Sequence, residues 1–139
     1  MPKEYLTDAI IKRNSEALNI FPYASQNSLF EDFPYILIIR LLSKKFAKLT
    51  IYPINRDKIL KVIFTGFSIQ SKVMEELIKK LKSFGIIHTS GITSIGDKLY
   101  YECYLDLSLN DTIYKDLKNV LDKIKKIFDD INIVEICLS

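Results

Sequence analysis

The sequence predicts an α+β fold, and the C-terminal half carries the observations that indicate it. Two stretches place apolar residues at helical spacing, and four short runs have the length and composition of β-strands. The helical stretches are residues 71–84 and 111–128, and the strand-like runs are residues 59–64, 86–94, 99–107 and 131–138. From about residue 58 the predicted order is therefore strand, helix, strand, strand, helix, strand.

The first strand and helix meet at a glycine turn. An apolar run over residues 59–64 leads through Gly66 into a helix that starts near Ser71 and stops at Gly85. One face of this helix is apolar, and lysines in its last turn suit the helix dipole. The apolar positions are Val73, Met74, Leu77, Ile78, Leu81 and Phe84.

The second half of the pattern is a hairpin followed by a helix and a final strand. A strand over residues 86–94, interrupted at Gly91, is joined by the turn at Gly96 to the clearest strand, residues 99–107. Its alternation puts Leu99, Tyr101, Cys103 and Leu105 on one face and Tyr100, Glu102 and Tyr104 on the other. Asn110 or Asp111 should cap the next helix. Its apolar face comprises Ile113, Leu117, Val120, Leu121, Ile124, Ile127 and Phe128.

Two such halves with both helices on one face form the ferredoxin-like βαββαβ sandwich. The right-handed crossover rule gives an antiparallel sheet of order 4-1-3-2. Cys103 and Cys137 then lie two strands apart, which is too far for an intrachain disulfide, so both are expected as small buried thiols.

We expect two parts: an N-terminal segment over residues 1–57 and the ferredoxin-like domain over residues 58–139. In the segment, Leu6, Ile10, Ile11 and Leu18 suggest a short helix. Residues 35–42 suggest a buried strand, with a helix reaching Phe46 as the open alternative. Turn residues 55–57 predict a hairpin between residues 49–54 and 59–64, which adds a strand.

Composition narrows the classes of function. The net charge of +3 is only mildly basic, and two cysteines with one histidine give no zinc pattern. No cofactor, metal site or catalytic residue is expected, and His88 has no catalytic motif around it. The chain shows no secretory signal and no run near ~18 apolar residues, so we expect a cytoplasmic protein with no membrane partner.

The turn of Gly66, Phe67 and Ser68 is the predicted ligand-binding site. Glycine lets the backbone approach a ligand, and free N–H groups at a helix start favour an anion. The alternative is a simple turn that needs a positive φ.

Around this turn the chain resembles ACT or ACT-like regulatory domains. The likeness covers residues 58–138 and rests on Val62-x-Phe64-x-Gly66, the helix ending at Gly85 and the hairpin that follows. It implies a small effector, often an amino acid, bound at Gly66, Phe67 and Ser68 and at a dimer interface. The acidic residue that the family usually has before this glycine is absent.

A second resemblance covers residues 42–81. The order of its strands, turn and helix is similar to the sensor half of archaeal bacterio-opsin-activator-like regulators. Those proteins carry a C-terminal helix-turn-helix, for which residues 82–139 show no pattern.

The leading interpretation is a non-catalytic regulatory or small-ligand-sensing domain that acts as a homodimer, with a role in transcription regulation as one form of it. The alternative is a nucleic-acid-binding protein. It would use the sheet face opposite the helices together with a basic cluster, through Arg40, Lys44, Lys45, Tyr100 and Tyr104. A small enzyme is a third interpretation, because ferredoxin-like folds host many activities.

Overall fold

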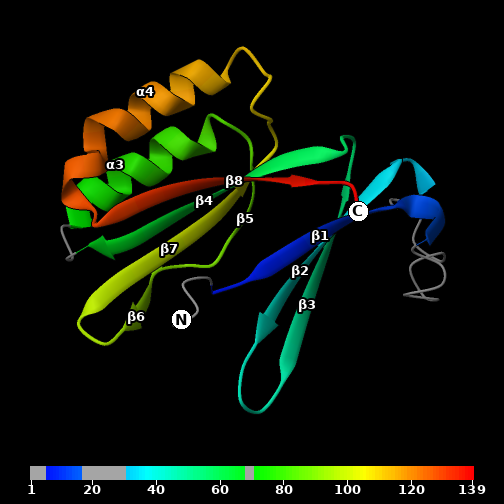
Figure 1. Cartoon of the computed structure of the whole chain (residues 1–139), viewed down its shortest axis with the longest axis horizontal. Coiled ribbons are helices and arrows are strands. Elements are labelled where there is room, and N and C mark those ends of the chain that lie inside the picture. Colours follow the sequence, from blue (N-terminus) through cyan, green and yellow to red (C-terminus); the bar gives the residue numbers. More distant parts are fainter. Residues whose placement is uncertain (1–5, 17–30, 68–70) are drawn as a thin grey trace. The chain divides into compact units, whose positions relative to one another are not determined.

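The computed structural model describes residues 6–16, 31–67 and 71–139 (Figure 1). The chain divides into two compact units. Unit 1 comprises Met1–Lys58 and Ile136–Ser139, and unit 2 comprises Ile59–Glu135. Both contain antiparallel sheets, and helices accompany the sheet of unit 2, so the predicted α+β class is confirmed.

Unit 1 is built on a three-stranded antiparallel sheet. Its strands are β1 (Asp8–Arg13), β2 (Tyr35–Leu42) and β3 (Ala47–Ile54), in that order across the sheet. The Oγ of Ser43 accepts hydrogen bonds from the N–H groups of Lys45 and Phe46 and closes the β2–β3 turn. Ile36 and Ile38 are buried with Ile51 packed against them, because alternate residues of paired strands share a face.

Two expectations for this unit were wrong. The segment containing Ile10 and Ile11 is strand β1, not a helix, and Leu18 lies outside the described residues. Residues 49–54 pair with β2 and not with residues 59–64, which belong to the other sheet. β3 pairs with β2 because β2, which precedes it across a short turn, is as long as β3 and pairs with every one of its residues. Residues 35–42 are a strand throughout, which removes the helical alternative.

Unit 2 contains the larger sheet and the helices α3 and α4. Along the sheet the strand order is β5-β7-β4-β8, with β6 paired to β7. The strand over residues 86–94 is interrupted around Gly91, as expected, and this glycine has a φ of +71°. The elements are β4 (Lys58–Phe67), α3 (Ser71–Lys82), β5 (Ile86–Thr89), β6 (Thr93–Ile95), β7 (Lys98–Leu105), α4 (Tyr114–Ile124), a 3-10 turn (Lys125–Ile127) and β8 (Asp130–Cys137).

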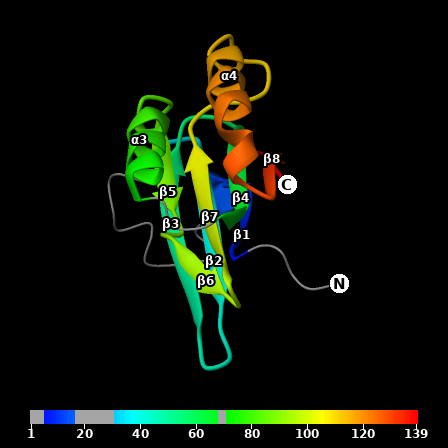
Figure 2. The same ribbon diagram turned by 90° about the vertical axis from the view of Figure 1, so that its left-hand side faces the viewer.

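One face of this sheet packs against both helices, as the sequence pattern predicted. The two helices lie on the same side of the sheet in both views (Figures 1 and 2). Phe64 of β4 is in the centre, with ring centroids 5.8 Å from Tyr101 and 5.1 Å from Phe128. The buried residues of this core are Leu60, Val62, Phe64, Met74, Leu77, Leu81, Phe84, Tyr101, Cys103, Leu105, Leu107, Leu117, Leu121 and Phe128.

The opposite face of β4 and β7 carries a buried ion pair. The Nζ of Lys61 lies 3.3 Å from Oε1 of Glu102 and 5.4 Å from the ring centroid of Tyr104. The ring of His88 meets that of Tyr104 edge-on at 6.0 Å. The side chains of Lys61, Glu102 and Tyr104 have almost no exposed surface. The nucleic-acid alternative needs this face to be open, and at these three positions it is buried.

Two smaller expectations, the capping of α4 and the burial of both cysteines, differ from the structure. The Asp111 carboxylate accepts hydrogen bonds from the N–H and hydroxyl of Ser108, whereas α4 starts at Tyr114 with no side-chain cap. Both cysteines are free, but only Cys103 is buried, and its burial raises the thiol pKa to about 12. Cys137 is exposed.

Over the described ranges, the structure has no helix with the length and apolar character to span a membrane.

Candidate functional site

Gly66 lies at an irregularity near the end of β4. Its φ is +71°, in the left-handed region that favours glycine, and the register between β4 and β7 shifts between Thr65 and Phe67. The side chain of Asp129 takes the space that a larger residue would need. A Cβ built on Gly66 would lie 2.7 Å from the Cβ of Asp129.

Asp129 joins three parts of unit 2 at this point. Its N–H donates to the carbonyl oxygens of Thr65 and Gly66, at 3.0 and 3.1 Å, so the start of β8 lies beside the end of β4. Its carboxylate forms an ion pair with Lys98 at the start of β7. The hydrogen bond from Lys98 to Asp129 raises the pKa of that lysine.

Beside the predicted ligand-binding turn, the space next to Gly66 is therefore occupied by a residue of the chain itself. Gly66 provides room, as expected, and the Asp129 carboxylate, which is paired with Lys98, fills that room. Phe67 ends β4, and Ser68 lies outside the described residues.

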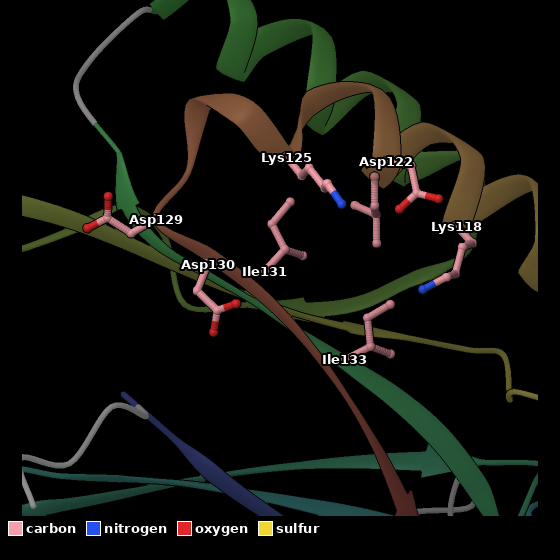
Figure 3. A pocket seen from close by; sticks show the side chains of 8 residues that line it. Lys118, Asp122, Lys125, Asp129, Asp130, Ile131 and Ile133 are labelled. Atoms are coloured by element: carbon pink, nitrogen blue, oxygen red, sulfur yellow. The ribbon is translucent and has the colours of Figure 1, made fainter.

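A pocket of about 370 Å³ lies beside this turn, between α4 and β8. In Figure 3, Lys118, Asp122 and Lys125 project from the helix side, and Ile131 and Ile133 project from the strand. The lining is completed by Leu121, Asp129 and Asp130.

The pocket combines an apolar base with charges of both signs. The isoleucines and Leu121 offer contact to carbon atoms, while two lysines and three aspartates also belong to the lining. Such a lining can hold a small molecule that carries both a positive and a negative group. Among the described residues no group of three or more His, Cys, Asp or Glu is placed to hold a metal ion.

The residues of the nucleic-acid alternative are less available than the sequence implied. Arg40 is bound by Asp8 through two hydrogen bonds of 3.0 and 2.6 Å, and this contact raises the pKa of the guanidinium. Lys44 and Lys45 are exposed in the β2–β3 turn of unit 1. In unit 2, Tyr100 is half-buried and Tyr104 is fully buried, so the Tyr104 ring cannot stack on a base in this state.

Sequence reasoning missed the charged lining of the pocket. Part of this lining could have been predicted, because Lys118, Asp122 and Lys125 have the i, i+4, i+7 spacing of residues on one face of a helix. No spacing rule connects Asp129 with Gly66, because a turn and a strand start meet there only in the folded chain.

The chain matches no protein-family model, no curated protein and no solved structure. The proposals below therefore depend on its own residues and geometry.

Replacing Gly66 by Ala should lower the free energy of unfolding by more than the same change at Gly96. Both glycines have a positive φ, +71° and +66°, where a non-glycine residue costs about 1–3 kcal/mol. Only at Gly66 does the new methyl group also meet a side chain, because nothing lies within 4 Å of a Cβ at Gly96. Urea unfolding of both variants gives the comparison. Equal losses would show that Asp129 does not occupy this space in solution.

Proposed function

We propose that this chain is a non-catalytic, small-ligand-sensing regulatory module, and that its unit 2 is a ferredoxin-like, ACT-like domain. The strand order β5-β7-β4-β8 supports the fold assignment. Counting β4, β5, β7 and β8 as the four strands of a βαββαβ motif gives the order 4-1-3-2 from β8 to β5. Packing of α3 and α4 against one sheet face also supports it.

The observation that carries the functional proposal is the charged pocket between α4 and β8. Its volume of about 370 Å³ falls within the range of about 300–1,000 Å³ that is typical for small-molecule sites. Lys118 and Lys125 can pair with a carboxylate of the ligand, and Asp122 with its ammonium group. A zwitterion such as an amino acid satisfies both signs at once.

Asp129 provides a route by which such a ligand would act on the rest of unit 2. It lines the pocket, and it also bonds the Gly66 turn and pairs with Lys98. A ligand ammonium group that attracts the Asp129 carboxylate would compete with Lys98. Ligand binding would then change the contacts that hold the β6–β7 turn and the end of β4. A regulatory domain needs this type of coupling between a ligand site and a second part of the fold.

A screen of the common amino acids by thermal shift, followed by calorimetry of any hit, tests this proposal. We expect at least one zwitterionic compound to raise the melting temperature and to bind with one site per chain. The Lys125→Gln variant should weaken that binding about tenfold, because a charge-assisted hydrogen bond is lost. Lys123→Gln is the matched control, since Lys123 lies two residues before Lys125, in the last turn of α4, and does not line the pocket. If Lys123→Gln weakens binding as much as Lys125→Gln, or if no compound stabilises the chain, the pocket is not the sensing site.

We also propose that the module acts in the cytoplasm as a homodimer. The strand order puts β5 and β8 at the two ends of the unit 2 sheet, and a sheet edge offers backbone groups to a second copy. Light scattering at working concentration distinguishes a dimer from a monomer. A part in transcription regulation would follow if the dimer carries its signal to a DNA-binding protein.

A further inference from the structure

Four large apolar side chains are exposed around the turn that joins β2 to β3. Phe46 is 60% exposed, Leu42 50%, Leu49 48% and Leu41 36%. We call residues 41–49 the hairpin tip. A soluble surface rarely gathers so many large apolar groups in so short a segment, so the tip is a candidate interaction surface.

The tip is a two-stranded ribbon that extends past the rest of its sheet. The register of β1 ends at the pair Asp8 and Arg40, so no residue of β1 lies beside the tip. Across the ribbon, Leu41 faces Lys48 and Leu42 faces Ala47. Because successive side chains alternate, Leu42 and Leu49 point to one face of the ribbon and Leu41 to the other. Both faces of the tip thus carry an exposed leucine, and on the face of Leu41 this leucine lies opposite Lys48.

All charged side chains of the hairpin tip are positive. Lys44 and Lys45 lie in the turn and Lys48 lies on β3, all three of them exposed. The sequence from residue 41 to residue 54 contains no Asp or Glu. The partner should therefore be anionic as well as able to accept apolar side chains.

We propose that the hairpin tip docks on the surface of an anionic lipid membrane. Phe46 and the leucines enter the boundary between headgroups and acyl chains, and the three lysines stay with the anionic headgroups. A lipid interface surrounds the ribbon and covers the leucines on both of its faces, whereas a flat protein surface covers only one face. A second copy docked tip to tip would bring lysines against lysines, and a nucleic-acid backbone would leave the leucines in water. This contact is peripheral, and it replaces our expectation of no membrane partner.

A single-tryptophan variant gives a direct measurement, because the chain contains no tryptophan. In Phe46→Trp, the emission should shift to the blue when vesicles of phosphatidylcholine and phosphatidylserine are added, and should stay unchanged with phosphatidylcholine alone. Flotation of the unmodified protein with the same vesicles should agree, and added salt should weaken it. Absence of both the shift and flotation would overturn the proposal.

Matched variants separate the apolar contribution from the charge contribution. Phe46→Ser should weaken flotation about tenfold or more, whereas Ile95→Ser, at a side chain 48% exposed in unit 2, should not. Lys44→Gln with Lys45→Gln should weaken it roughly thirty-fold, because each headgroup-facing lysine contributes about five- to six-fold. The exposed pair Lys79→Gln with Lys80→Gln is the control.

Three other results would contradict lipid docking at this tip. Equal loss in the control variants would place the contact elsewhere. Conversion of a dimer to a monomer by Phe46→Ser, seen by light scattering, would make a second copy the occupant. Binding of an oligonucleotide that depends on Phe46, without vesicle binding, would assign the tip to nucleic acid. None of these outcomes depends on the pocket between α4 and β8, so the two proposals can fail separately.

Discussion

Replacing Lys61 by Met should lower the free energy of unfolding by about 3 to 5 kcal/mol. The ammonium group of Lys61 lies 3.3 Å from a carboxylate oxygen of Glu102, and the two side chains are 5% and 0% exposed. Methionine has a similar length, so little packing is lost, but the Glu102 carboxylate keeps its charge in a buried place without this ammonium group. The cost comes from that charge and not from the missing bond itself.

A double variant provides the control for this prediction. When Glu102 is also replaced by Met, the buried charge disappears, and stability should return to within about 1 to 2 kcal/mol of the original chain. Denaturant unfolding of the original, both single variants and the double variant completes the cycle. If the effects of the two single changes simply add, the ion pair does not form in solution.

Much of unit 2 could be predicted from the sequence because its patterns agree with one another. The alternation of Tyr101 and Cys103 with Glu102 and Tyr104 correctly separated the helix-facing side of β7 from the other side. Unit 1 was harder. Ile10 and Ile11 fit a helix face as well as a strand over so short a stretch. Turn residues 55–57 favour a hairpin between residues 49–54 and 59–64, but β3 pairs with β2 along its whole length.

The candidate site was less predictable than the fold, and Gly66 shows why. Its positive φ was foreseen as an alternative to ligand binding, and the structure confirms the positive φ. The residue that fills the space beside it, Asp129, comes from a distant part of the chain. The pocket needs α4 and β8 to lie side by side before Lys118, Asp122 and the isoleucines of β8 form one lining. Tertiary packing creates this proximity, which periodicity cannot show.

The largest losses from a single apolar change should come from the two helices that cover the unit 2 sheet. Leu81 of α3 is 0% exposed and Leu121 of α4 is 4% exposed, and both belong to the same buried cluster as Phe64. Leu81→Ala and Leu121→Ala should each lower the free energy of unfolding by about 2 to 5 kcal/mol, through lost apolar burial and the cavity left behind.

Leu109→Ala is the matched control, because it removes the same atoms from a side chain that is 44% exposed in the loop before α4. We expect it to change stability by less than about 1 kcal/mol. Leu81 should be the more sensitive position, since it has no exposed surface through which the core could relax. The midpoints of urea unfolding of the three variants, each compared with the original chain, measure these losses of stability. Losses at Leu81 and Leu121 no larger than at Leu109 would mean that α3 and α4 do not pack on this sheet.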